Sequence, residues 1–145
     1  MAVATGKTAA WAKVGRACLY ISAQTPPSDA DWQEYLKWLA AAGKPNAANP
    51  EVISLVYERS AGPTPSQRKQ LNDVTSGWKL RVAVMTPSAL VRGMVTAMNW
   101  FKKDSYEAFP LEQLDAAITY LQTPPNLVAE VKGTVFGLIK DLDKP

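Results

Sequence analysis

The fold is decided by the stretch Leu80-Arg81-Val82-Ala83-Val84-Met85-Thr86-Pro87-Ser88-Ala89-Leu90-Val91-Arg92. Up to Met85 it is a short apolar run with the length of a β-strand, and after Pro87 its apolar residues recur with helical spacing. Thr86 stands before a proline, which holds it extended and leaves its hydroxyl able to cap backbone amides. Pro87 suits a first helical turn, where the N–H that it lacks would have had no partner. The stretch therefore predicts a strand that leads directly into a helix.

Three further Thr-Pro dipeptides divide the chain in the same way, at Thr25-Pro26, Thr64-Pro65 and Thr123-Pro124. Gly15 marks a bulge or a hairpin turn near the first strand. The alternation of strands and helices predicts an α/β fold with a mainly parallel sheet of about four to five strands and helices on both faces. The apolar spacing places strands at 14–21, 52–57, 80–85 and 105–109, and helices at 29–42, 66–75, 88–101, 111–121 and 126–142.

The length and composition of the chain fit a single globular domain. It has 145 residues, of which 47% are hydrophobic and 20% are charged. We expect residues 1–10 to be a flexible N-terminus, residues 11–122 to form an α/β domain, and residues 123–145 to add an amphipathic C-terminal helix. The first residues lack the hydrophobic core of a signal peptide, and no apolar run approaches the roughly 20 residues of a membrane helix. We therefore expect a cytoplasmic protein without a membrane partner.

The composition also argues against several classes of function. The chain has no histidine, which removes the usual general base and the commonest metal ligand. We therefore expect neither an enzyme nor a metal or other cofactor. The single Cys18 lies in an apolar run, where a buried hydrophobic role is more common than a reactive one. The net charge of +3 includes no basic run longer than two residues, so nucleic acid is not the expected partner.

The order of the segments resembles the STAS domain of bacterial anti-sigma-factor antagonists, over roughly residues 11–121. The resemblance rests on three units: the strand 52–57 that runs into a turn and helix, the strand 81–85 that enters Thr86-Pro87-Ser88, and the short strand 106–109 before a Leu-rich helix. It implies a STAS-like fold and a regulatory role that is exercised through contacts with another protein.

One signature of that family is absent from this chain. In the family, the helix after the second crossover begins with Asp-Ser-Ser/Thr-Gly, and a partner kinase phosphorylates its Ser or Thr. Here the corresponding turn reads Ser60-Ala61-Gly62-Pro63-Thr64-Pro65-Ser66. Ser60, Thr64 and Ser66 are candidate phosphorylation sites by position, near Arg59 and a helix N-terminus that both favour added negative charge. The alternative is that Thr64 or Ser66 simply caps the helix.

A second candidate site lies where the strand ending at Met85 meets its helix. Thr86, Ser88 and Arg92, together with free helix amides, can hold a small anion or the phosphate of a nucleotide, and Arg59 can add a second positive charge. No Gly-rich loop precedes this helix, and a Thr-Pro-Ser cap can satisfy the same amides without a ligand. The site supports an alternative function as a small-anion or nucleotide sensor.

The C-terminal segment carries a long apolar stripe that something must cover. In one alternative the stripe packs on its own domain, and in the other it lies against a protein partner or a second copy of the chain. Trp38 lies off the apolar stripe of its own helix and is our candidate for a surface anchor. The candidate interaction residues of the C-terminal segment are Leu127, Val131, Val135, Leu138 and Leu142. The sequence thus predicts a non-catalytic STAS-like module that acts through protein contacts, with self-association through the C-terminal helix as one form.

Overall fold

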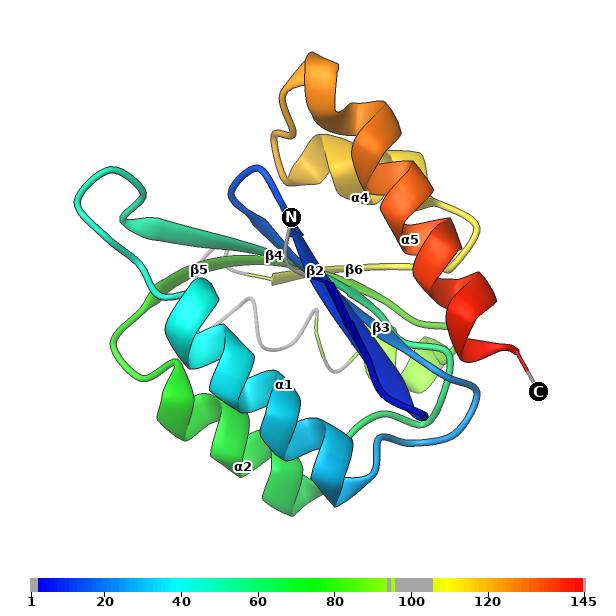
Figure 1. Cartoon of the computed structure of the whole chain (residues 1–145). Coiled ribbons are helices and arrows are strands. Elements are labelled where there is room, and N and C mark those ends of the chain that lie inside the picture. Colours follow the sequence, from blue (N-terminus) through cyan, green and yellow to red (C-terminus); the bar gives the residue numbers. More distant parts are fainter. Residues whose placement is uncertain (1–2, 94, 96–105, 145) are drawn as a thin grey trace.

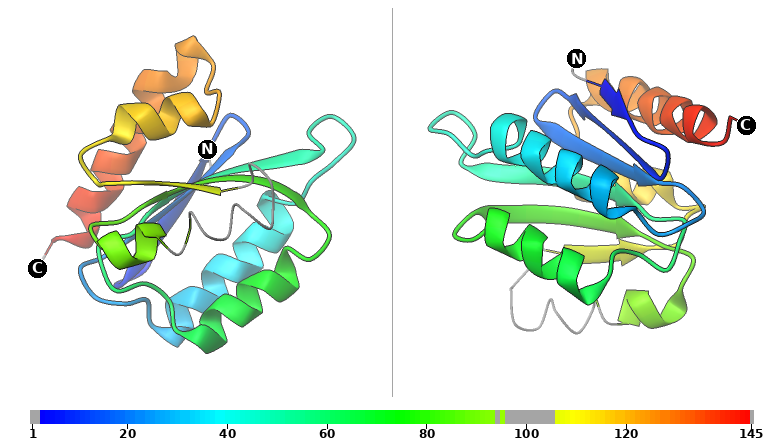
Figure 2. Two further views of the ribbon diagram at one scale, coloured as in Figure 1. Left: turned by 180° about the vertical axis from the view of Figure 1, so that it is seen from behind. Right: turned by 60° about the horizontal axis from the view of Figure 1, so that its bottom comes forward.

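The computed structural model describes residues 3–93, 95 and 106–144, and it is an α/β fold of three layers (Figure 1). The central sheet lies between α1 and α2 on one face and α4 and α5 on the other (Figure 2). The strands are β1 (Val3–Thr5), β2 (Ala9–Val14), β3 (Ala17–Ser22), β4 (Glu51–Tyr57), β5 (Lys79–Met85) and β6 (Tyr106–Phe109). The helices are α1 (Asp29–Ala42), α2 (Pro65–Val74), α4 (Leu114–Tyr120), the 3-10 helix η1 (Pro125–Leu127) and α5 (Val128–Leu142).

The described strands form a six-stranded sheet in which each strand lies beside the next one in the sequence. The pairings β3 to β4, β4 to β5 and β5 to β6 are parallel, as predicted. The pairings β1 to β2 and β2 to β3 are antiparallel, so the prediction of a mainly parallel sheet of four to five strands is corrected to a mixed sheet. β2 and β3 are antiparallel because Gly15, with a φ of 58°, makes a tight hairpin turn with Arg16 between them.

The N-terminal residues are part of the sheet, although they were expected to be flexible. Val3–Thr5 pairs with β2 as an edge strand, and Ala9 and Ala10 are fully buried. The prediction for residues 1–10 is therefore wrong where the structure describes them. In the expected helix 88–101, residues 89–93 and 95 are helical, and Met94, Met98 and Phe101 lie outside the described residues.

The sheet has a different core on each face. On the α1 face, aromatic rings from the sheet and the helix pack together, and the centroids of Tyr20 and Tyr35 lie 4.6 Å apart. On the other face, α4 and α5 cover an aliphatic cluster that includes Leu19 and Leu55. Val131, Val135 and Leu138 of α5 are buried in this cluster, with exposed fractions of 2%, 0% and 3%.

The burial of α5 decides between the two alternatives for the C-terminal segment. Its apolar stripe packs on the chain's own sheet, so Val131, Val135 and Leu138 are not available to a partner. Leu142 is half-buried against the same cluster, and the Leu127 side chain lies over Gly15. The prediction that this stripe contacts a partner is therefore corrected.

The Thr-Pro dipeptides mark helix starts, but the capping residue is a threonine only at Thr64. There the hydroxyl accepts a hydrogen bond from the Gln67 amide at 3.1 Å, and the Gln67 side chain accepts one from the Thr64 amide at 2.9 Å. This capping box confirms that Thr64 caps a helix. At α1 the cap is Ser28, and the Thr123 hydroxyl instead donates to the Ile118 carbonyl at the end of α4.

Candidate functional site

The carboxyl ends of β3 and β4 lie next to the N-termini of α1 and α2, on one edge of the parallel part of the sheet. Ligands and partners of open α/β sheets gather at such edges, because strand ends and helix starts converge there. The polar residues of this edge are concentrated in the turn that follows β4. Glu58, Arg59 and Ser60 are the first three residues of that turn, and each makes contacts that the sequence alone did not predict.

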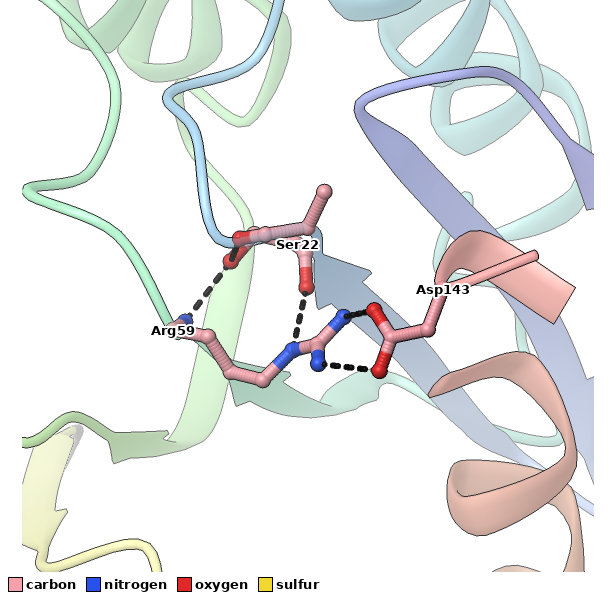
Figure 3. A network of polar contacts seen from close by, with 4 residues as sticks. Ser22, Arg59 and Asp143 are labelled. Carbon is pink, nitrogen blue, oxygen red and sulfur yellow. Dashed lines mark hydrogen bonds and ion pairs between the residues drawn. The ribbon is translucent and has the colours of Figure 1, made fainter. Parts of the chain in front are cut away.

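Arg59 joins three distant parts of the chain (Figure 3). Its guanidinium donates two hydrogen bonds of 3.0 Å to the two carboxylate oxygens of Asp143, directly after α5. Its Nε donates to the Ser22 carbonyl at 3.0 Å, and its backbone amide donates to the Ser22 hydroxyl at 2.7 Å. The hydrogen bonds from Arg59 hold the pKa of Asp143 below its ordinary value. Arg59 therefore fastens the end of α5 to the ends of β3 and β4.

Glu58 is buried at the base of the turn, with only 5% of its surface exposed. Its Oε1 accepts a short hydrogen bond from the Ser60 hydroxyl and a second one of 3.3 Å from the Ser60 amide. Among the described atoms, its Oε2 has no hydrogen-bond partner, and neither has the buried hydroxyl of Tyr20. The turn is thus hydrogen-bonded to a buried carboxyl group of which only one oxygen has a hydrogen-bond partner among the described atoms.

Burial is the main reason that the pKa of Glu58 is raised, since removing a carboxylate from water disfavours its charged form. The neighbouring hydroxyls of Ser22 and Ser60, the Ser60 amide and the charge of Arg59 act in the opposite direction and lower this pKa. Burial also raises the pKa of Tyr20, and the charge of Glu58 contributes to that shift. The two residues therefore belong to one buried polar cluster on the α1 face of the sheet.

The raised pKa of Glu58 predicts a distinct pH dependence of stability. The folded state holds the proton more tightly than the unfolded state, so the free energy of unfolding falls as pH rises from the ordinary value of 4.5 through the raised pKa. The variant Glu58→Gln keeps an oxygen for Ser60 and carries no charge. Its free energy of unfolding, measured by urea titration, should therefore exceed that of the unchanged chain by about 1 kcal/mol near pH 8 and by little near pH 4.

Urea titrations of both proteins across this pH range test the prediction. Glu107→Gln is the control, because Glu107 is exposed on β6 and should change stability by less than about 0.5 kcal/mol at either pH. Asp143 does not confuse the result. Its pKa is lowered, so its contribution is lost only as pH falls below 3.8. An equal gain at both ends of the range would contradict the role assigned to Glu58.

The three candidate phosphorylation sites have different surroundings. Ser60 is half-buried and bound to Glu58, and its oxygen also accepts a hydrogen bond of 3.0 Å from the Gly62 amide. Thr64 is the cap of α2, and Ser66 is exposed in the first turn of that helix. Arg59 was expected to serve a phosphate or another anion, but its side chain is bound to Asp143 and Ser22. Ser60 is thus the candidate that is connected to the buried cluster.

The other candidate site, at the end of β5, uses its polar groups within the fold. The Thr86 hydroxyl accepts from the Ser88 amide at 3.2 Å, and the Ser88 hydroxyl accepts from the Val91 amide at 3.2 Å. Arg92 donates to the Thr86 carbonyl at 2.8 Å. Thr86 itself is 1% exposed. These contacts give an internal role to the groups that were predicted to hold an anion.

Trp38 is placed differently from the prediction of a surface anchor. Its ring stacks on Tyr35 with a centroid distance of 6.2 Å and an interplanar angle of 27°. The side chain is half-buried and packs against the aromatic cluster on the α1 face. Trp38 therefore contributes to the chain's own packing, and the prediction is corrected.

No family model and no curated protein matches the chain. A solved structure does match: an uncharacterized protein from the DUF3478 family with a SpoIIAA-like fold, from Shewanella loihica PV-4. The two chains share 17% sequence identity, the match covers 81% of this chain and 97% of the other, and the TM-score is 0.59. This chain has a SpoIIAA-like fold. The STAS-like fold implied by the order of the segments is thereby confirmed.

Within the described residues, no three Cys, Asp or Glu side chains gather in a way that would hold a metal ion. None of the helices in the described part of the chain is long and apolar enough to cross a membrane. The turn of Glu58, Arg59 and Ser60 is distinguished by its hydrogen bonds to buried groups.

Proposed function

We propose that this chain is a non-catalytic, cytoplasmic regulatory module that binds a protein partner through the turn of residues 58–64. One observation carries the proposal: the hydroxyl of Ser60, on the turn, donates a hydrogen bond to the buried carboxyl group of Glu58. Loops on a rigid scaffold are common binding elements. Here Ala61 and Thr64 are exposed, and Glu58 and Arg59 hold the beginning of the turn in place.

The same contact provides a means of regulation. A phosphate on Ser60 would remove the hydroxyl group that donates a hydrogen bond to Glu58 and would add negative charge next to its carboxyl group. Like charges this close repel each other, so the modified turn would leave its present position. A partner that recognises the unmodified turn would then lose its binding surface. The proposal is thus a switch in which the buried Glu58 makes the conformation of the turn depend on the state of Ser60.

Binding is favoured over catalysis by the way these groups are used. The chain has no histidine to activate a serine, and the hydroxyls of Ser22 and Ser60 already donate hydrogen bonds to groups within the fold. Arg59 is bound on both of its sides, by Asp143 and by Ser22. Groups that are fixed in this way hold a surface in shape, which suits recognition of another protein.

Site-specific photo-cross-linking tests the proposal. A photoreactive amino acid replaces Ala61 at the exposed tip of the turn, and a second protein carries it at Lys44, which is exposed in a different loop. We expect a discrete adduct with another protein from Ala61 and none from Lys44. The background change Ser60→Ala should retain the adduct, whereas Ser60→Glu should reduce its yield about tenfold, because charge at residue 60 displaces the turn. Equal yields at both positions, or an adduct that Ser60→Glu leaves unchanged, would overturn the proposed function.

A further inference from the structure

The side of α5 that faces away from the sheet is unpartnered and partly apolar. Phe136 is 56% exposed there, next to Val135, which is fully buried on the opposite side. Ala129, Gly133 and Gly137 are exposed at intervals of four residues, which places them one above another on the helix. We call this surface the outer face of α5 and define it by Ala129, Gly133, Phe136, Gly137 and Lys140.

The two glycines of the outer face have no close neighbours that would require a glycine in the single chain. A Cβ atom built on Gly133 or Gly137 has none of the described atoms within 4 Å, and neither residue has a positive φ. At Gly43, by contrast, such an atom would lie 2.6 Å from the Leu39 side chain. Glycine is a poor helix former, so two of them in the middle of a helix lower its stability without a local reason. Close approach by a second backbone, which only a small residue permits, provides that reason.

The charges on α5 are complementary to a second copy in the antiparallel direction. Glu130 lies in the first turn and Lys140 in the last, both side chains are exposed, and no ion pair of either is found among the described residues. Glu130 and Lys140 each lie five residues from Val135, one on either side, and Gly133 and Gly137 each lie two residues from it. In an antiparallel pair of α5 helices whose two-fold axis lies at the height of Val135, Glu130 of one copy is therefore level with Lys140 of the other. A parallel pair would set like charges side by side, which is unfavourable.

We propose that two copies of this chain associate through the outer faces of their α5 helices, antiparallel and related by a two-fold axis. Gly133 of one copy lies against Gly137 of the other, the Phe136 rings flank this crossing, and each Glu130 pairs with the opposite Lys140. The helix has 15 residues and is roughly 22 Å long, so one such contact is smaller than a standard stable interface. The dimer is therefore weak and depends on concentration. It does not involve the turn of residues 58–64.

Sedimentation equilibrium of the full chain from about 5 µM to about 1 mM tests the proposal. The mass should approach twice 15.8 kDa at the highest concentration and fall toward 15.8 kDa on dilution. Lys140→Glu sets an acid opposite Glu130 twice in the symmetric dimer and should raise the dissociation constant about tenfold. Adding Glu130→Lys reverses both charges and should restore the original constant. The control Lys44→Glu makes the same change of net charge in a distant exposed loop and should have no effect.

Variants of one glycine separate close approach from charge. Gly137→Leu has open space for its side chain in the single chain and should keep the fold, as circular dichroism would show, while it abolishes the dimer. Gly137→Ala adds one methyl group and should weaken the dimer less. A mass of 15.8 kDa at every concentration would overturn the proposal, as would a dimer that neither Gly137→Leu nor Lys140→Glu weakens. Either result would leave the cross-linking result at Ala61, and so the proposed function, unaffected.

Discussion

The variant Val135→Asp is expected to lose more than about 4 kcal/mol of stability, which is a large part of the 5–15 kcal/mol typical of a domain. Val135 is fully buried where α5 meets the sheet, and a carboxylate at this position would have no water and no described positive group in the surrounding cluster. The chain would have to detach α5 or bind a proton. We expect a lost or strongly broadened thermal transition and a protein that aggregates because the sheet face is uncovered.

The matched control is the neighbouring residue. Phe136→Asp makes the same kind of change one position along α5, but Phe136 points away from the sheet and is 56% exposed. It should alter the free energy of unfolding by less than about 1 kcal/mol when measured by urea at low protein concentration. If both variants unfolded, α5 would not have one buried and one exposed side, and the described packing of this helix would be wrong.

Gln67→Ala is expected to cost about 3 kcal/mol, an unusual loss for a residue near a helix end. Gln67 is 2% exposed and holds two helix starts together. Its side-chain oxygen completes the capping box with Thr64, and its side-chain nitrogen donates to the Pro27 carbonyl and to Asp29, each at 3.0 Å. Truncation removes these bonds and leaves a small cavity beside the N-terminus of α1.

Gln70→Ala provides the comparison on the same helix. The Gln70 side chain makes a single exposed hydrogen bond, which it accepts from Gln33 at 3.0 Å. Its removal should cost less than about 0.5 kcal/mol, because water replaces an exposed partner readily. Thermal unfolding of both variants and the unchanged chain measures the difference. Equal small losses would mean that the buried contacts of Gln67 do not fix α1 against α2.

The elements with local signals could be predicted from the sequence almost to the residue. The helix predicted at 29–42 is α1, Asp29–Ala42, because Ser28 precedes it, its apolar residues follow helical spacing and Gly43 ends it. The strands β4 and β5 begin one residue earlier than predicted, as expected for apolar runs bounded by turns. Each of these signals comes from neighbours in the sequence, so no knowledge of the tertiary structure was needed.

The first part of the sheet could not be predicted in this way. β2 reads Ala9-Ala10-Trp11-Ala12-Lys13-Val14, and alanine has little intrinsic preference for strands. It is a strand because α1 packs on one of its faces and α5 on the other, and the latter helix is more than a hundred residues away in the sequence. Packing of this range overrides a weak local preference.

The contacts that connect the candidate site were missed for a related reason. Ser60 was selected by position, but Arg59 and Asp143 are 84 residues apart, and no sequence pattern connects them. Glu58 had a usable signal, since an acidic residue directly after a buried strand must be either exposed or specially accommodated. The prediction for Thr86 and Ser88 failed in the opposite sense. Their hydroxyls fit the pattern of an anion site, but they accept hydrogen bonds from backbone amides at the start of the helix.

The order of the strands also affects how the chain is made in the cell. Each strand of the sheet lies beside the one synthesised before it, so the sheet can grow strand by strand as the polypeptide leaves the ribosome. The helix α5 behaves differently, because it covers β2 and β3, which precede it by more than a hundred residues. Until residues 128–142 emerge, the nascent hairpin has an uncovered apolar face. Synthesis therefore leaves the apolar face of the β2–β3 hairpin dependent on a helix that is made more than a hundred residues later.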